Sequence, residues 1–262
     1  MNYQSIILEE KNQVAWLTLN RGAVHNAFDD NMIAELLHAL AQVRSNNNVR
    51  MLVLQAQGKN FSAGADLTWM RSMATKNYAE NIKDASELAR LMQELDELPQ
   101  PTVALVQGAA FGGAVGLAAC CDICLATPTA SFCLSEVKIG LIPAVISPYV
   151  MRAIGTRQAR RFMLTAERFS ADVAQQMGLV HSLVDDLEEA VTPVIEQLLG
   201  NGPHAVAAAK KLILTLDQQP LNENTRTTTI EAIAAIRVSA EGQEGLSAFL
   251  EKRSPDWKTT NK

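Results

Sequence analysis

Apolar residues in this chain follow two spacings, and their order along the sequence divides it into two parts. Up to about residue 185, short apolar runs typical of buried strands alternate with segments whose apolar residues recur every three or four positions, as in amphipathic helices. Beyond that point the spacing is almost entirely helical. Alternating strands and helices are typical of an α/β fold. The sequence therefore predicts an α/β core over residues 1–200 and a helical C-terminal region over residues 201–262.

The predicted elements have the lengths usual for a globular protein. The predicted strands are 5–9, 14–19, 51–55, 102–106, 123–126 and 131–134. One predicted helix starts after Asp29 or Asp30, and a second contains Leu88. Four more helices are predicted in the tail, at 188–199, 204–216, 223–240 and 246–252. The polar stretch around residues 71–81 has no predicted element and is expected to be mobile.

Length and charge narrow the class of protein. A chain of 262 residues buries enough surface to fold without a disulfide or a metal. The net charge of −5 disfavours non-specific binding to nucleic acids. No apolar run approaches the ~20 residues that span a bilayer, and the first residues lack the pattern of a signal peptide. We therefore expect a cytoplasmic protein that binds neither nucleic acid nor membrane.

The four cysteines raise the question of a metal site. Cys121 and Cys124 have the Cys-x-x-Cys spacing, but no second pair and no histidine follow at the spacing of a zinc site. Their neighbours are apolar. The sequence predicts reduced, buried cysteines that pack as small hydrophobic residues, and no metal.

Two segments of small residues follow strand-like apolar runs. The first is Phe61–Leu67 (FSAGADL) and the second is Gly108–Gly116 (GAAFGGAVG). Small side chains leave backbone N–H groups accessible, and two such loops at one point would supply a pair of donors for a negatively charged oxygen. The pair Gly112-Gly113 at a helix start adds the N–H groups of a helix N-terminus. A purely structural role in packing is the alternative for each glycine-rich turn.

Glu136 is the candidate acid or base. It follows a predicted strand within an apolar stretch, where burial would raise its pKa towards neutrality and suit it to proton transfer. The alternative is a structural glutamate that caps a helix or pairs with Lys138.

The ordered motifs of this chain resemble those of the enoyl-CoA hydratase/isomerase (crotonase) family over nearly the whole length. The matching segments are LNR at 19–21, NAF at 26–28, FSAGADL at 61–67, the glycines at 108, 112 and 113, CDI at 121–123, SEV at 135–137, GLIP at 140–143, LTA at 164–166, Ala174 with GLV at 178–180, and AFLEKR at 248–253 with Pro255 and Trp257.

The resemblance implies a spiral of ββα units with a C-terminal helical trimerisation region, assembled as a homotrimer or a dimer of trimers. It implies an acyl-CoA thioester as substrate, with coenzyme A as part of that substrate and no further cofactor. The N–H groups of Ala65 and Gly113 would bind the thioester oxygen, and Glu136 would be the catalytic carboxylate. The residues that would contact substrate or coenzyme A are Val24, Ala63, Ala65, Asp66, Leu67, Gly112, Gly113, Gly116 and Lys252, the last from its own or a neighbouring subunit.

One departure from the family pattern leaves the reaction open. Hydratases of this family typically carry a second glutamate at the position of Gly116, so this chain keeps only Glu136. A hydratase using Glu136 as both base and acid, a double-bond isomerase, a decarboxylase and a non-catalytic acyl-CoA-binding protein are all compatible with that pattern.

Two segments point to a branch of the family. The segments LIPAVISPYV at 141–150 and AERF at 166–169 resemble the bacterial methylglutaconyl-CoA and carboxygeranoyl-CoA hydratases of leucine and acyclic-terpene breakdown. Gly116 would leave room, and remove a negative charge, for a substrate with its own carboxylate. The alternative is that Gly116 only allows close helix packing.

Overall fold

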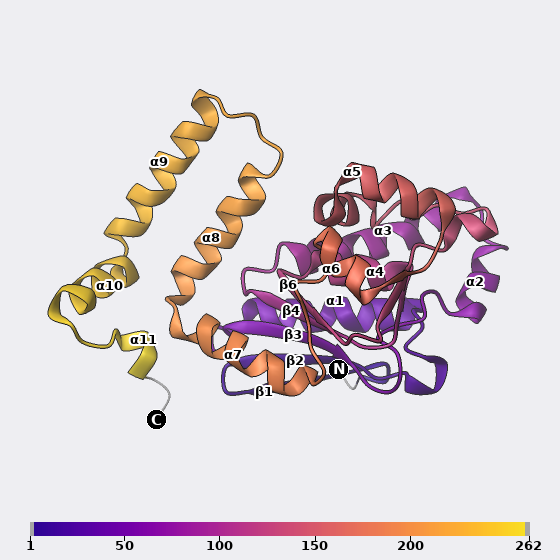
Figure 1. Cartoon of the computed structure of the whole chain (residues 1–262), viewed down its shortest axis with the longest axis horizontal. Helices are drawn as coiled ribbons and strands as arrows, with labels where there is room; N and C mark the ends of the chain where they lie inside the picture. Colours follow the sequence, from indigo (N-terminus) through magenta and orange to yellow (C-terminus); the bar gives the residue numbers. More distant parts are fainter. Residues whose placement is uncertain (1–2, 260–262) are drawn as a thin grey trace.

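The computed structural model describes residues 3–259 and shows a mixed α/β core followed by a run of helices (Figure 1). A six-stranded sheet has the order β1-β2-β3-β4-β6-β9. Strands β1 and β2 form an antiparallel hairpin, and the other neighbours are parallel. These strands are β1 (Ile6–Lys11), β2 (Val14–Leu19), β3 (Met51–Ala56), β4 (Thr102–Val106), β6 (Ile123–Ala126) and β9 (Ser182–Leu183).

A second, three-stranded sheet carries the segments of interest. It consists of β5 (Ala109–Phe111), β7 (Ser131–Cys133) and β8 (Phe169–Ser170), in that order. Side chains alternate between the faces of a strand, so Phe132 and Phe169 share one face, where their rings stack with centroids 5.5 Å apart. That face closes part of the core, and the strand ends lead directly into the glycine pair and Glu136.

Helices cover both faces of the six-stranded sheet. The larger core cluster lies under α1 (Asp30–Ser45), α3 (Tyr78–Asp96), α4 (Gly113–Cys120), α5 (Ser147–Thr165) and α6 (Ala171–Met177). Helix α1 starts where the Asp29 side chain accepts a hydrogen bond from the Met32 amide. On the opposite face, α7 (Leu187–Gly200) packs against a smaller apolar cluster that includes Val53 and Val103.

The C-terminal helices extend away from the sheets. Figure 1 shows α8 (Pro203–Leu216), α9 (Glu223–Val238) and α10 (Ala240–Glu251) projecting to one side of the core, followed by α11 (Asp256–Thr259). Helix α8 remains tied to the core because Lys210 Nζ lies 2.7 Å from Asp122 Oδ2. The predicted α/β core with a helical region after it is therefore confirmed as an arrangement of elements.

Three local expectations were wrong. The first hairpin turn lies at Asn12 and Gln13, both with positive φ, so β1 runs two residues beyond its predicted end. The polar stretch 71–81 contains the end of α2 (Leu67–Met73) and the start of α3, which Asn77 caps together with Glu80. The helix predicted over 223–240 breaks at Ser239, whose hydroxyl caps α10.

All four cysteines are buried free thiols, as predicted. Burial raises the pKa of Cys124 to about 12 and also raises that of Cys121 and Cys120. The described residues hold no group of three or more His, Cys, Asp or Glu side chains arranged to bind a metal. No helix within residues 3–259 is long and apolar enough to cross a membrane.

Candidate active site

The two small-residue loops lie side by side. The Ser62 amide donates to the Ala109 carbonyl at 3.0 Å, and the Phe111 amide donates to the Ser62 carbonyl at 3.0 Å. A Cβ on Gly64, which has a φ of +97°, would lie 3.3 Å from the Phe111 carbonyl oxygen. The first loop therefore runs along β5 as an irregular extra strand, and glycine at 64 permits the close approach.

Phe28 touches both loops and organises the two candidate donors. Its amide donates to the Gly64 carbonyl at 2.8 Å, and its carbonyl accepts from the Asp66 amide at 2.7 Å. These two bonds bracket Ala65 and leave the Ala65 amide without an acceptor in the described chain. A Cβ on Gly113 would be 3.8 Å from Cε2 of the Phe28 ring. Gly113 is the first residue of α4, so its amide has no partner within the helix.

Glu136 lies against the second loop. Its Oε1 is 3.1 Å from the place a Cβ on Gly112 would occupy, and Gly112 has a φ of +55°. The Gly112 amide donates to the Cys133 carbonyl at 2.9 Å, which ties this loop to the strand that leads to Glu136. Only glycine combines that backbone conformation with so close an approach of the carboxylate.

The environment of Glu136 favours its neutral form. Burial raises the pKa of Glu136, and a backbone hydrogen bond opposes the rise. Its Oε2 is buried without a hydrogen-bond partner among the described residues. It is the first residue of the short helix η2 (Glu136–Ile139), and Lys138 of the same helix forms no ion pair with its carboxylate. The alternative of an ion pair with Lys138 is therefore not realised, and one oxygen of this buried carboxylate lacks a partner among the described residues.

A charged network that the sequence did not reveal fixes the first loop. Asp66 caps α2 by accepting from the Thr68 and Trp69 amides. Arg21 lies 3.1 Å from Asp66 and 2.9 Å from Asp29, so one guanidinium joins the caps of α2 and α1. Burial alone would raise the pKa of Asp66, but these hydrogen bonds and the Arg21 charge hold it below its usual range. We expected Asp66 to contact coenzyme A, yet its carboxylate is already engaged by protein donors.

The network leads to a prediction for Asp66→Ala. Losing an N-cap costs about 1 kcal/mol, and the loop that holds the Ala65 amide loses its anchor. We expect a Tm lower by about 2–4 °C and a reduced kcat, measured by thermal unfolding and turnover. Asp186→Ala is the matched control, because Asp186 caps the distant α7 through the Glu188 and Glu189 amides. The control is expected to lose stability but not turnover; equal turnover in both variants would contradict the role given to Asp66.

Gly116 does not leave room for substrate, contrary to the expectation from the sequence. A Cβ at this position would lie 2.3 Å from Ile146 Cγ2, 2.8 Å from Ile146 Cβ and 3.2 Å from Met92 Sδ. Gly116 is buried within α4. The alternative that Gly116 allows close packing is the one the structure shows. Ile146 was missed because nothing in a single sequence pairs position 146 with position 116.

The remaining candidates divide into accessible and distant residues. Ala63 and Ala65 are exposed, Val24 is 43% exposed and Leu67 is 71% exposed, so these four can meet a ligand at the open side of the loops. Lys252 follows α10, which Figure 1 shows far from α4. The structure therefore does not bring Lys252 to the loops of its own chain.

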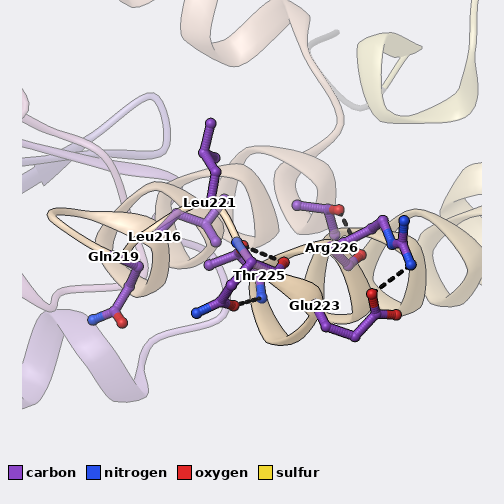
Figure 2. Close-up of a pocket in the computed structure, with 8 residues that line it drawn as sticks. Leu216, Gln219, Leu221, Glu223, Thr225 and Arg226 are labelled. Atoms are coloured by element: carbon purple, nitrogen blue, oxygen red, sulfur yellow. Dashed lines mark hydrogen bonds and ion pairs between the residues drawn. The ribbon is translucent and has the colours of Figure 1, made fainter.

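Two sizeable hollows lie elsewhere. One of about 460 Å³ lies at the turn between α8 and α9, where Glu223 pairs with Arg226 and Thr225 bonds to Asn222 (Figure 2). The other, of about 660 Å³, lies between α8 and the core beside Asp96 and Arg152. Neither is lined by Glu136, Ala65 or Gly113. The candidate site therefore rests on the two loops and the Glu136 carboxylate and not on either of these hollows.

Comparison with known proteins agrees with this geometry. The family model described as enoyl-CoA hydratase/isomerase matches residues 9–260. The crystal structure of an enoyl-CoA hydratase from Shewanella pealeana is 53% identical, with a TM-score of 0.96 over 97% of this chain and 96% of its own. The 2,3-dehydroadipyl-CoA hydratase of Escherichia coli is 30% identical over 97% of this chain and 98% of its own.

An isomerase is also among the relatives. The trans-2-decenoyl-(acyl-carrier-protein) isomerase of Streptococcus mutans is 29% identical over 97% of this chain and 98% of its own. Hydratases and isomerases thus share this sequence pattern, and the similarity to the solved structures extends over both the core and the C-terminal helices. The chain has the crotonase fold and belongs to the enoyl-CoA hydratase/isomerase family of enzymes.

Proposed function

We propose that this protein is an acyl-CoA hydratase that adds water across the 2,3-double bond of an enoyl-CoA. The observation that carries the proposal is the position of Glu136. Its carboxylate lies against Gly112, the residue before Gly113, and the amides of Ala65 and Gly113 have no acceptor in the described chain. A carbonyl activator and a proton-transfer group are thus adjacent.

In the proposed mechanism, the thioester oxygen accepts hydrogen bonds from the amides of Ala65 and Gly113. These donors stabilise the enolate that forms when water adds to C3, and removing one such donor typically costs about 3 kcal/mol of transition-state stabilisation. Glu136 takes a proton from the attacking water and returns a proton to C2. The raised pKa of Glu136 suits both steps, because the same group must accept and release a proton.

A branched or carboxylated acyl group, such as 3-methylglutaconyl, is the finer part of the proposal. Because position 116 is a glycine, a carboxylate on the substrate would meet the negative charge of Glu136 but not that of a second glutamate at position 116. One relative is named for a dicarboxylic acyl group, 2,3-dehydroadipyl. The resemblance of segments 141–150 and 166–169 to the methylglutaconyl-CoA branch also supports this substrate class.

A turnover screen tests the function. Purified protein is incubated separately with crotonyl-CoA, 3-methylglutaconyl-CoA and longer 2-enoyl-CoAs, and the products are identified by mass and chromatography. We expect 3-hydroxyacyl-CoA products, formed fastest from the branched, carboxylated substrate. Faster turnover of crotonyl-CoA would overturn the finer part, and no hydration of any substrate would overturn the whole.

An isomerase is the second candidate, favoured by the relationship to the Streptococcus mutans isomerase. With one carboxylate, Glu136 could move a proton between two carbons without adding water. A 3-enoyl-CoA distinguishes the two reactions, because an isomerase converts it to the 2-enoyl-CoA and stops there. Binding of enoyl-CoA without any turnover would instead identify a non-catalytic acyl-CoA-binding protein.

The proposal also includes the setting of the reaction. We expect no cofactor beyond the coenzyme A of the substrate, a cytoplasmic location and a homotrimer or a dimer of trimers. Large apolar side chains exposed on the C-terminal helices support self-association. They are Ile213, Ile230, Ile233, Val238, Leu246, Phe249 and Leu250. A second subunit packed on these helices would also decide whether Lys252 reaches a neighbouring site.

A further inference from the structure

The face of α4 at Gly116 is covered by Ile146, with Met92 beside it. Gly113 and Gly116 are three residues apart and therefore lie on the same face of α4. Their separation along the helix axis is about 4.5 Å, from the usual rise per residue. Ile146 Cγ2 lies 2.3 Å from the Cβ position of Gly116, so Ile146 covers this face one turn beyond the donors.

Ile146 is held firmly in this position. It is 2% exposed, and Met92, which is fully buried, lies beside it next to Gly116. The turn before it is fixed because the Ser147 hydroxyl donates to the Pro143 carbonyl at 2.6 Å. The Val150 amide donates to the Ile146 carbonyl at 3.0 Å as α5 begins. A ligand would have to displace packed side chains to extend along α4.

Two large apolar side chains near the candidate residues are exposed. Leu67, two residues after Ala65, is 71% exposed, and Ile142 is 72% exposed. The Leu141 amide donates to the Glu136 carbonyl at 3.1 Å, which keeps this second segment next to the candidate base. Leu67 and Ile142 thus offer exposed apolar surface close in sequence to Ala65 and to Glu136, whereas the packed Gly116 face of α4 offers none.

We propose that Ile146 is a specificity-determining residue that limits the size of the second substituent on C3 of the acyl group. A C3 carbon with two substituents directs them to different sides. One runs out over the apolar rim, and the other faces the wall that Ile146 closes beside Gly116. The site then accepts a small group such as methyl on the α4 side and rejects a larger one. This inference rests on the hydratase function proposed above.

The two geometric isomers of 3-methyl-2-pentenoyl-CoA test the proposal, because they exchange methyl and ethyl between the two sides of C3. We expect the protein to prefer one isomer at least tenfold in kcat/KM, since one methylene in an apolar pocket changes kcat/KM about 10–200-fold. Ile146→Ala removes three side-chain carbons and is expected to reduce this preference at least tenfold. Ile146→Val, which keeps the Cγ2 group, should fall between the two.

Ile154→Ala is the matched control. Ile154 is a buried isoleucine inside α5, two turns beyond the N-cap residue Ile146, and is not among the nearest neighbours of the Gly116 Cβ position. We expect Ile154→Ala to keep the isomer preference of the unmodified protein. Equal use of both isomers by the unmodified protein, or a preference unchanged in Ile146→Ala and Ile146→Val, would overturn the proposal.

The same assays separate this inference from the hydratase function. If the unmodified protein hydrates the substrates and Glu136→Gln does not, an unchanged isomer preference in the Ile146 variants counts against Ile146 alone. If the unmodified protein hydrates no 2-enoyl-CoA, both proposals fail. Because Ile146→Val changes a single methyl group, it keeps the test decisive should Ile146→Ala not fold.

Discussion

Glu136→Gln is expected to lower kcat for enoyl-CoA hydration by ~10²-fold or more, the usual contribution of a general acid or base. A carboxamide has nearly the same shape as the carboxylate, so it still fits against Gly112. It cannot accept the proton of the attacking water. The Ala65 and Gly113 amides are unchanged, so binding of a 3-hydroxyacyl-CoA, measured by titration calorimetry, should be retained.

Folding is not expected to explain that loss. Glu136 Oε2 is buried without a partner among the described residues and burial raises the pKa of Glu136, so a neutral side chain suits the position at least as well. The Tm of Glu136→Gln should equal or exceed that of the unmodified protein. Glu196→Gln, a change to an exposed glutamate of α7, is the control with full activity. Full activity in Glu136→Gln would remove Glu136 from the mechanism.

The pH profile gives a second readout of the same assignment. Addition of water needs the ionised form of Glu136, and burial raises its pKa, so kcat/KM should fall on the acid side at a pH above that at which an exposed glutamate titrates. Circular dichroism over the same range checks that the protein stays folded. An acid limb that persists unchanged in the residual activity of Glu136→Gln would belong to another group.

Gly116→Ala is expected to destabilise the protein, because the new methyl group has no free space. Alanine is better than glycine in a helix by about 1 kcal/mol, but the new methyl group would lie 2.3 Å from Ile146 Cγ2. Overpacking of this kind typically costs about 1–3 kcal/mol. We expect a net loss in the free energy of unfolding, measured with urea.

A second substitution should relieve the conflict. Ile146→Gly removes both atoms that approach Gly116 within 3 Å, and glycine is tolerated at an N-cap such as position 146. The double variant should be more stable than the sum of the two single changes predicts, by about 1 kcal/mol or more. Gly200→Ala is the control, since its new methyl group meets only Lys258 Cε at 3.9 Å. If the effects of Gly116→Ala and Ile146→Gly on the free energy of unfolding simply added, the new methyl group would not be in conflict with Ile146.

Much of the fold follows from local sequence patterns. Strands β4 and β6 have the bounds that their apolar runs predict, and α1 begins at the predicted Asp29 cap. These elements are determined by neighbouring residues, through strand burial and capping. The polar stretch 71–81 was mispredicted because Asn77 and Glu80 form a capping box, which stabilises a helix start without any apolar residue.

The candidate site was only half visible in the sequence. The Gly-rich loops and Glu136 could be found because the chemistry requires their residue types. The joint role of Arg21, Asp29 and Asp66 could not be found, because the two carboxylates are 37 positions apart and meet only through tertiary structure. The contact between Gly116 and Ile146 was missed for the same reason, and Gly116 was consequently misread as open space.

The Arg21 network bears on when the candidate donor amides become oriented. The caps of α1 and α2 share one guanidinium, and Phe28 and Asp66 hold the Ala65 segment between them. The donor amides are thus oriented when the protein folds, before any thioester arrives. Binding then requires little further loss of backbone entropy, so more of the interaction with the oxygen remains for the enolate. In the proposed mechanism, Arg21 would act on the reaction barrier indirectly, by holding the two helix caps beside the donor segment.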